Sequence, residues 1–435
     1  MIAGLGLIAL LFVLIMINVP VYVSLGVAGT TGLAIIAMGP GFGDPFIAIP
    51  QSLYSGIGFF PLLAIPLFIL AGEIMNRSGI TDKLVRFSVM LIGRMPASLA
   101  NANILASMFF GGITGSAQAD TSAVGGVLIP AMVKEGYSKE IAVAVTASSS
   151  TVGPIIPPSI MMVIYGVSVG TSVGALFIAG VIPGILIGLS LIGTVLVLDR
   201  KHKFPRRTAS IPLAEKLTIT REAIWPLMMP GIIVGGILGG VVTPTEAGAL
   251  AVLYALLFGY VIQRSLRLSE LPQMLLHTAT LTAAVMMIIS CAKILSYTLT
   301  VFQLPNLLGA FFQTFSENPI IFLLLVNLLL LVIGTFMDGG ASVIILAPIL
   351  TPIAISYGID PVHFGVIMVL NLIIGCGTPP LGLCLFIACG IAKIPVERGA
   401  IAILPFIAAE IAVLMLVTYI PWLALALPHY FEFVS

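Results

Sequence analysis

The chain has 435 residues, of which 59% are hydrophobic and 8% are charged, and its formal net charge is +1. Soluble domains carry charge on about 25% of their residues, so this composition excludes an ordinary soluble protein. Apolar runs of about 20 residues, the length that spans a bilayer as a helix, recur along the sequence. They cover residues 2–18, 21–38, 59–75, 172–198, 223–242, 246–262, 273–292, 319–335 and 400–427.

Backbone polar groups inside a bilayer must pair within the protein, so the runs predict an all-α polytopic membrane protein. The first run has neither a basic segment before it nor a small-residue cleavage site, and we interpret it as a retained helix. The four cysteines lie in apolar segments without CxxC spacing, which favours buried thiols over metal or redox chemistry. The basic clusters stand beside predicted spans, which argues against nucleic-acid binding.

The distribution of Lys and Arg predicts the orientation. Between Lys293 and Lys393 the sequence has neither residue. By the positive-inside rule, the basic clusters are cytoplasmic and the loops of this interval face the other side. The number of membrane crossings that keeps every basic cluster in the cytoplasm is reached most simply with about ten spanning helices plus two re-entrant hairpins. If two spans flank Asn18–Pro20, the same count places the N-terminus outside. The basic clusters are at 77–94, 199–221, 264–267 and 393–398, and the hairpins are at 97–132 and 319–356.

The two predicted hairpins share a sequence pattern. "DTSAVGGVLIP" begins at Asp120, and "DGGASVIILAP" begins at Asp338, 218 positions later. Downstream, Gly153 precedes a Pro-Pro pair by four residues, and so does Gly375, 222 positions later. Because the hairpins enter from opposite sides, we predict two inverted-topology repeats, each with an interrupted helix, as in secondary transporters. The alternative is that these glycines and prolines only let helices pack or kink.

Several motifs together resemble the large membrane subunit of tripartite ATP-independent periplasmic (TRAP) transporters, of the DctM-like and SiaM-like kind. The resemblance implies an elevator-type, sodium-coupled importer in the bacterial inner membrane. It also implies two partners, a small four-helix membrane subunit and a soluble periplasmic binding protein. The expected substrate is an organic acid, with sialic acid favoured and C4-dicarboxylates next. The motifs are "GGITGSAQADTSAVGGVLIPAM" (111–132), "STVGPIIPPS" (150–159), "TPTEAGALAV" (243–252), "GTFMDGGASVIILAPIL" (334–350) and "GTPPLG" (377–382).

By analogy with that family, the chain divides into scaffold and transport parts. The amphipathic stretches 81–94 and 305–315 are expected to be interfacial arms that brace the moving part. The expected parts are N-terminal scaffold helices (1–58), a first inverted repeat (59–198) with hairpin 97–132 and broken helix 138–168, a basic cytoplasmic loop with two scaffold helices (199–270), a second inverted repeat (271–427) with hairpin 319–356 and broken helix 361–392, and a C-terminal tail (428–435).

A broken helix leaves N–H groups unpaired at one new terminus and carbonyls at the other. The first set suits a carboxylate and the second suits Na⁺. We therefore predict two or more bound Na⁺ ions and no organic cofactor. The residues predicted for the first ion are Thr114, Gly115 and Ser116 at the tip, with Gly153, Ile156 and Pro158 at the break; Gly334, Gly375 and Thr378 are predicted for the second.

Polar side chains beside these breaks are candidates for the substrate site. Their hydroxyls could instead bond carbonyls of their own helix. Asp120 and Asp338 begin the returning helices in equivalent places, so each is first expected to cap its helix. A carboxylate there would also attract cations, and it would repel an anionic substrate. The candidates are Ser116, Asp120, Thr121, Ser122, Ser149, Ser150, Thr151 and Asp338.

Other intramembrane charges are functional candidates by default. Glu73 and Lys293 lie in related positions if the 218-residue shift is applied. Lys293 could attract the substrate or pair with an acid, whereas Glu246 follows "TPT" at the start of a span and is expected mainly as a cap. Glu410, inside the last run, receives no role.

Enzymatic function is not expected. The Ser-rich breaks have no nearby His to serve as a base, and Asp120 and Asp338 belong to hairpins that enter from opposite sides. The sequence also has no GxxxxGK[ST] motif for ATP. The inverted repeat favours alternating access over a passive channel, and the alternative left open is a proton-coupled carboxylate carrier that works without a binding protein.

Overall fold

The computed structural model describes residues 2–17, 19–39, 44–206, 212–315 and 317–433. These residues form helices and contain no β-strand. Met1, Asn18, Arg207 and the end of the predicted tail (434–435) lie outside the described residues. Eight of the described helices are long and apolar enough to cross a membrane: Phe60–Arg77, Val173–Lys201, Leu213–Leu238, Pro244–Ile262, Leu268–Val301, Pro319–Phe336, Gly339–Ser356 and Val396–Tyr419.

The N-terminal part is a group of helices that pack on one long helix. It comprises α1 (Ile2–Met16), α2 (Val21–Ala37) and, after η1 (Pro45–Ile47), α3 (Ala48–Ile57). Both α2 and α3 pack against α13 (Leu271–Val301). Gly29 permits the close approach of α2, because a Cβ there would lie 2.9 Å from the Leu295 backbone nitrogen. The apolar runs did not predict α3, which is only ten residues long.

The first hairpin consists of two helices that meet in a tight turn. α6 (Ser98–Thr114) ends at Gly115, whose φ of 60° suits glycine, and α7 (Ala117–Lys134) begins after Ser116. Before the hairpin come η2 (Phe60–Leu63), α4 (Ala64–Arg77) and α5 (Ile80–Ile92). After it come α8 (Lys139–Ser149), η3 (Ser150–Val152), α9 (Ile160–Val169) and α10 (Val173–His202).

The second hairpin repeats this order of elements. α15 (Pro319–Phe336) and α16 (Gly339–Ser356) form the hairpin and follow α14 (Leu304–Phe315). α17 (Pro361–Gly377) and α18 (Leu383–Ala392) then form the interrupted helix, and both Pro-Pro pairs, 157–158 and 379–380, contain a cis peptide bond. The last helices are α19 (Val396–Tyr419) and α20 (Trp422–Tyr430), so part of the predicted tail is helical.

Helix boundaries correct the predicted equivalence of the two hairpins. α7 and α16 both have 18 residues, and each boundary of α16 lies 222 positions after that of α7. This is the offset of the two breaks, so one offset relates both pairs of elements, and the 218-residue alignment is wrong by one helical turn. Asp338 caps α16 as Ser116 caps α7, whereas Asp120 is the fourth residue of α7 and corresponds to Ser342.

The segment between the repeats is more helical than predicted. α11 (Leu213–Leu238) begins ten residues before the expected apolar run, so Lys216 and Arg221 belong to a helix rather than to a loop. α12 (Pro244–Leu256) continues into the π-helical η4 (Leu257–Ile262), and η5 (Leu268–Glu270) leads into α13. The basic connection is therefore shorter than the predicted 199–221.

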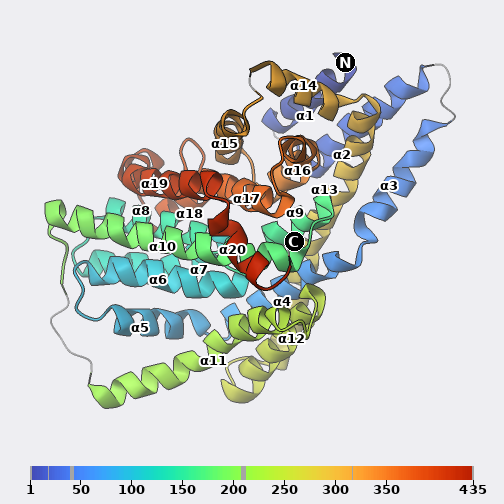
Figure 1. Ribbon diagram of the computed structural model, residues 1–435. Coiled ribbons are helices and arrows are strands. Elements are labelled where there is room, and N and C mark those ends of the chain that lie inside the picture. Colours follow the sequence, from blue (N-terminus) through green and yellow to red (C-terminus); the bar gives the residue numbers. More distant parts are fainter. Residues whose placement is uncertain (1, 18, 40–43, 207–211, 316, 434–435) are drawn as a thin grey trace.

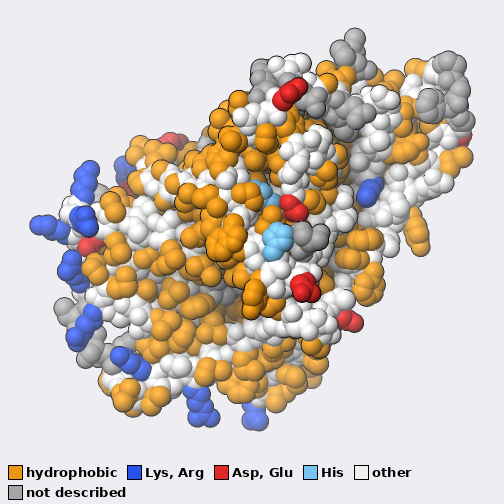
Figure 2. Space-filling model, in the orientation of Figure 1, with side chains coloured by type: hydrophobic (Ala, Val, Ile, Leu, Met, Phe, Trp, Pro, Cys, Tyr) orange, Lys and Arg blue, Asp and Glu red, His pale blue; other side chains and the backbone are white. Residues whose placement is uncertain are grey.

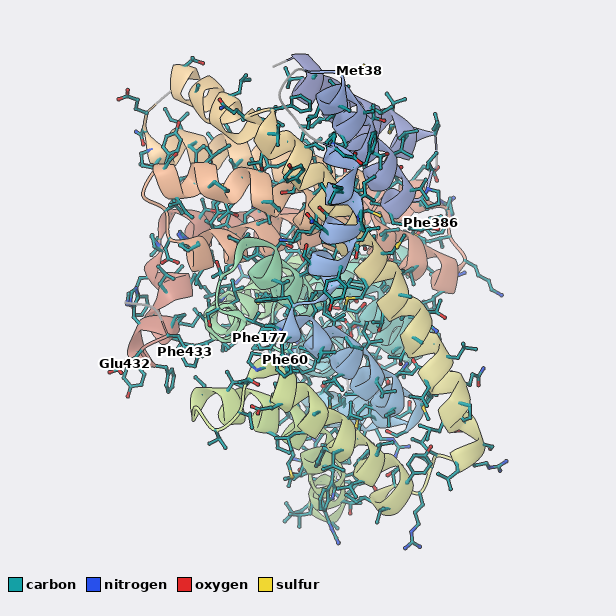
Figure 3. All side chains as sticks on the ribbon, turned by 90° about the vertical axis from the view of Figure 1, so that its right-hand side faces the viewer. Met38, Phe60, Phe177, Phe386, Glu432 and Phe433 are labelled. Atoms are coloured by element: carbon teal, nitrogen blue, oxygen red, sulfur yellow. The ribbon has the colours of Figure 1, made fainter. Side chains whose placement is uncertain are left out.

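The two hairpins and the broken helices form one packed body. α6, α8 and α19 each contact α10, and Figure 1 shows them running side by side. Phe177 of α10 lies near the centre of the molecule in Figure 3, is 1% exposed, and its ring centroid is 6.0 Å from that of Phe68. Figure 2 shows an extensive apolar surface, with Lys and Arg gathered along the left and lower edges. This distribution suits a body surrounded by lipid.

Candidate functional site

At the first tip, the hairpin and the break are in backbone contact. A Cβ on Gly111 would lie 2.2 Å from the Gly153 Cα, and one on Gly115 would lie 2.5 Å from the Pro158 carbonyl oxygen. The tip residues and Gly153 and Pro158, predicted together, are thus brought together. The carbonyls of Pro157 and Pro158 accept no hydrogen bond from any described residue, which leaves them free as oxygen ligands. Ile156 instead packs toward α10, beside Gly184.

The second tip repeats this contact. A Cβ on Gly375 would lie 2.5 Å from the Gly334 Cα, so the predicted pair of glycines does meet. In the break that follows, the carbonyls of Pro379 and Pro380 accept no hydrogen bond within the described part of the chain. The Thr378 hydroxyl, predicted as a side-chain ligand, donates to the Ile374 carbonyl at 2.7 Å. The hydroxyl oxygen retains a lone pair, so it could bind Na⁺ while its hydrogen stays bonded to the Ile374 carbonyl.

Both tips face one cavity of about 600 Å³. Its walls come from α4, the first tip, α9, α13, the second tip and α17. The charged or titratable nitrogen and oxygen groups on these walls are Glu73, His277 and Asp338. No Lys or Arg is among the described residues that line it. An anion that enters this cavity therefore meets carboxylates, and no described lysine or arginine on the cavity walls is there to bind it.

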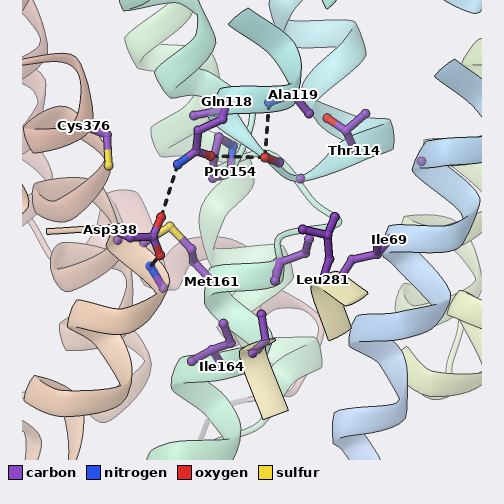
Figure 4. A pocket seen from close by; sticks show the side chains of 18 of the residues that line it. Ile69, Thr114, Gln118, Ala119, Pro154, Met161, Ile164, Leu281, Asp338 and Cys376 are labelled. Atoms are coloured by element: carbon purple, nitrogen blue, oxygen red, sulfur yellow. Dashed lines mark hydrogen bonds between the residues drawn. The ribbon is translucent and has the colours of Figure 1, made fainter. Parts of the chain in front are cut away.

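A chain of hydrogen bonds joins the two tips across the cavity (Figure 4). The Ala119 N–H donates to the Ser116 hydroxyl at 3.4 Å, and that hydroxyl donates to the Gln118 Oε1 at 3.2 Å. The Gln118 Nε2 then donates to the Asp338 Oδ2 at 3.3 Å. On the far side, Asp338 Oδ1 accepts from the Gly340 and Ala341 N–H groups at 3.0 and 3.2 Å. The caps of α7 and α16 are thereby linked through one glutamine.

The two aspartates singled out by sequence have different surroundings. Asp338 caps its helix as predicted and faces the cavity. Asp120 is 0% exposed, does not line the cavity and does not cap α7. It lies near the hydroxyls of Ser107 and Ser150, but neither of its oxygens has a hydrogen-bond partner among the described residues. The expectation that both aspartates begin their helices is therefore wrong for Asp120.

Most of the hydroxyls predicted for the substrate site lie inside the packed body of helices and not in the cavity. The Thr121 hydroxyl donates to Ala117 and that of Ser150 donates to Thr146, both at 2.8 Å to carbonyls of their own helix. Ser149 is bonded to Asn103 and Ser107 of α6. Thr121 points into the packed body because the residues on the cavity side of α7 are Ala117, Gln118, Ala119 and Ser122. Of the predicted hydroxyl residues, Ser116 and Ser122 line the cavity.

Two residues that sequence reasoning missed belong to this region. Gln118 lies inside a quoted motif, but an isolated amide gave no signal. Glu410 of α19 is 0% exposed, and its Oε1 accepts from the Thr151 hydroxyl at 2.7 Å. Thr151 also lies next to the second break, because a Cβ on Gly377 would be 3.3 Å from the Thr151 Cγ2. A charged residue within an apolar run was the available signal for Glu410.

The other predicted charges are distributed over three places. Glu73 lines the cavity and accepts from Arg77 at 2.6 Å, and His277 Nε2 lies 4.0 Å from the other oxygen of Glu73. Lys293, in contrast, is exposed on α13 and does not line the cavity. That Glu73 and Lys293 occupy related positions in the two repeats stays a prediction. Glu246 completes a capping box with Thr243, as the simpler reading expected.

A family model described as "Tripartite ATP-independent periplasmic transporter, DctM component" matches residues 8–423. The chain belongs to this family. It is 40% identical over 407 residues to the C4-dicarboxylate TRAP transporter large permease protein DctM of Pseudomonas aeruginosa, covering 94% of each chain. It is 39% identical over 420 residues to the sialic acid TRAP transporter large permease protein SiaM of Vibrio cholerae, covering 93% of this chain and 97% of that one.

A further relative is a longer protein, whose name, DctMQ, combines two permease designations. The isethionate TRAP transporter permease protein DctMQ of Oleidesulfovibrio alaskensis is 38% identical over 417 residues, which is 96% of this chain and 64% of that protein. Among solved structures, the YdaH transporter of Alcanivorax borkumensis matches with a TM-score of 0.64 and 15% identity over 88% of this chain and 89% of that one, which shows the fold alone.

Membership establishes a multi-pass protein of the inner membrane and a transporter subunit. It also implies a small membrane subunit and a periplasmic binding protein as partners. The sequence resemblance to DctM-like and SiaM-like proteins is confirmed.

Proposed function

We propose that this TRAP permease is the large subunit of a sodium-coupled, binding-protein-dependent importer of an organic acid. The observation that carries the proposal is the convergence of two hairpin tips on a cavity whose described lining residues include Asp338 and no lysine or arginine. Burying an organic anion beside a carboxylate is unfavourable unless cations bind with it. The free carbonyls at both breaks are hard oxygen ligands for Na⁺, so ion and acid would bind together.

The residues proposed for the two ions are those whose backbones meet at the tips. The first ion would lie between the turn at Gly115 and the carbonyls near Pro158. The second would lie between Gly334 and the break that begins at Thr378, with Asp338 nearby. The backbone N–H groups at the start of α7 and α16 would then face the substrate's carboxylate.

We further propose an elevator mechanism, in which the body that contains both hairpins moves against a scaffold. The scaffold would be residues 1–58 and 199–270, with α5 and α14 as connecting arms. Contacts of α5 with both α6 and α11 support this division, because α5 then links the moving body to the scaffold.

The acid itself is proposed by class. Relatives named for a C4-dicarboxylate and for sialic acid are 40% and 39% identical to this chain, so overall identity does not separate the two substrates. A cavity of about 600 Å³ also accommodates either acid. Sialic acid, favoured by the sequence resemblance, is the first substrate to test, and a C4-dicarboxylate is the second.

The test is uptake into proteoliposomes that contain the chain, its small membrane subunit and its binding protein. Labelled N-acetylneuraminate and labelled succinate are supplied under an inward Na⁺ gradient or an inward H⁺ gradient, imposed separately. We expect uptake of one acid that needs the Na⁺ gradient and the binding protein. Uptake driven by H⁺ alone, or equal uptake without the binding protein, would support the proton-coupled carrier instead.

A further inference from the structure

Among the described residues, Gln118 is the one side chain that bonds to both helix caps at the cavity. Its Oε1 accepts from Ser116 at 3.2 Å, and its Nε2 donates to Asp338 at 3.3 Å. Gln118 also lines the cavity, and Figure 4 shows its carboxamide between the two tips. The contact spans 220 positions of sequence, so it joins one hairpin directly to the other.

The chemistry of these partners fixes the orientation of the amide. An ionised carboxylate only accepts hydrogen bonds, so Asp338 requires the NH₂ end of the amide and would repel its oxygen. A hydroxyl both donates and accepts, so Ser116 can satisfy the oxygen end that remains. The amide is therefore held with its nitrogen toward the second tip.

A primary amide nitrogen carries two hydrogens, and Asp338 uses one of them. Gln118 makes no second Nε2 hydrogen bond with any described residue. The remaining N–H belongs to a side chain that lines the cavity and whose rotation is restricted at both ends. A fixed donor at the start of α7 lies where the helix N-terminus also favours a negative group.

We propose that Gln118 is a substrate-binding residue that donates its free Nε2–H to a carboxylate oxygen of the transported acid. Asp338 and Ser116 orient this donor, and its bond to Asp338 reduces the repulsion that the aspartate would otherwise exert on the acid. The inference rests on the proposed function, since it assigns a contact to an organic anion in this cavity. It predicts a preference for substrates whose acid group can accept this N–H.

The test compares Gln118→Met, which keeps the length of the side chain, with Gln118→Glu, which keeps its shape but replaces the donor by a second carboxylate. Gln51→Glu is the matched control, because Gln51 is exposed on α3 and does not line the cavity. Each variant is purified with the small membrane subunit. Binding of labelled N-acetylneuraminate and labelled succinate is then measured by scintillation proximity at saturating NaCl. The affinity for Na⁺ is measured separately, in the absence of acid, by isothermal titration calorimetry, because coupled binding would otherwise carry a change in acid affinity into the apparent Na⁺ affinity.

Hydrogen bonds to charged groups correspond to about a ten- to hundred-fold change in affinity. We expect Gln118→Met to weaken binding of the acid by that factor, Gln118→Glu to weaken it further, and Gln51→Glu to match the wild type. The Na⁺ affinity measured without acid should stay unchanged in Gln118→Met, whereas a general loosening of the tips would lower it.

Binding by Gln118→Met and Gln118→Glu within about twofold of the wild type would overturn the inference, since a lost hydrogen bond to a charged group exceeds that factor. A parallel loss of acid and Na⁺ affinity in Gln118→Met would also overturn it, by showing a structural role. If the wild-type complex neither binds nor takes up either acid, the proposed function fails and the inference falls with it.

Discussion

The two hairpins use the same backbone plan with different side chains. In both, a hairpin tip touches the broken helix through a pair of glycines, and the returning helices are equal in length and 222 positions apart. The cap is Ser116 in the first hairpin and Asp338 in the second. The first hairpin instead keeps its acid, Asp120, buried one turn beyond the cap. Backbone geometry is thus repeated, whereas the placement of charge is particular to each half.

The breaks differ in the same way. Thr151, in the first break, is bonded to Glu410 at 2.7 Å and is fully buried. The position 222 residues later is Ile373, an apolar residue that lines the cavity. The first break is therefore tied to α19 by a polar contact at Thr151, whereas the equivalent position in the second half carries no polar side chain. We infer that the two sites should respond unequally to equivalent substitutions, except where the shared backbone contact is removed.

The largest effect is expected from the shared glycine contacts. Gly111→Ala and Gly375→Ala would place a Cβ 2.2 Å and 2.5 Å from a backbone Cα of the partner glycine. Backbone cannot rotate away, so each substitution should exceed the upper end of the ~1–3 kcal/mol typical of overpacking. The measurement is thermal unfolding and monodisperse yield of the purified complex.

The matched controls are Gly126→Ala in α7 and Gly390→Ala in α18, where no atom lies within 4 Å of the added Cβ. Both should behave like the wild type. Wild-type stability of Gly111→Ala or of Gly375→Ala would show that the corresponding tip does not pack against its break in this way.

An intermediate effect is expected at the first break alone. Glu410→Ala removes this acceptor, while the Thr151 hydroxyl keeps the Ser148 carbonyl at 2.6 Å. The loss of one hydrogen bond should therefore cost about 0.5–1.5 kcal/mol of stability. Glu410→Gln retains a side-chain oxygen that can accept the bond and should recover most of the loss. Thermal unfolding of both variants measures this, and Glu397→Ala, an exposed position on the same helix, serves as the control. Equal stability of the Ala and Gln variants would contradict the role of the Thr151–Glu410 bond.

The smallest effect on stability, and the sharpest on function, is expected from exchanging the caps. Asp338→Ser keeps a good N-cap residue and should change stability by less than about 0.5 kcal/mol. Among the described cavity carboxylates, Asp338 is the one without a basic partner, whereas Glu73 pairs with Arg77. Its removal should therefore raise half-saturating Na⁺ about tenfold, the equivalent of ~1.4 kcal/mol. Sodium-dependent uptake in proteoliposomes measures this. The reciprocal Ser116→Asp should lower half-saturating Na⁺, and unchanged sodium dependence in both variants would refute the assignment.

Much of the architecture could be predicted from local patterns. Apolar runs of spanning length, the two pairs of Gly and Pro-Pro, and the charge distribution indicated an all-α membrane protein with two interrupted helices. Family motifs indicated a TRAP permease, which the family comparison confirmed. These features are carried by neighbouring residues, and the bilayer requires backbone pairing whatever the tertiary contacts are.

The register of the repeat and the fate of individual polar residues were harder to predict. Asp120 and Asp338 both precede similar apolar runs, and a shift of four residues leaves that pattern nearly unchanged because four residues are about one helical turn. Only the helix boundaries decide which residue is the cap. Ser149, Ser150 and Thr151 were predicted to be cavity residues because they stand beside the first break in the sequence. Their hydroxyls instead bond within the packed body, which depends on how the helices pack.

Local patterns in the sequence were enough to show that this chain crosses the membrane repeatedly, that two helices are broken, and that its motifs are those of a TRAP permease. Tertiary structure decided that Asp338 rather than Asp120 faces the cavity, that Glu410 meets Thr151, and that Gln118 joins the two caps. The reason is physical: breaks and spans follow from local composition, but a contact between residues 220 positions apart depends on how two hairpins pack.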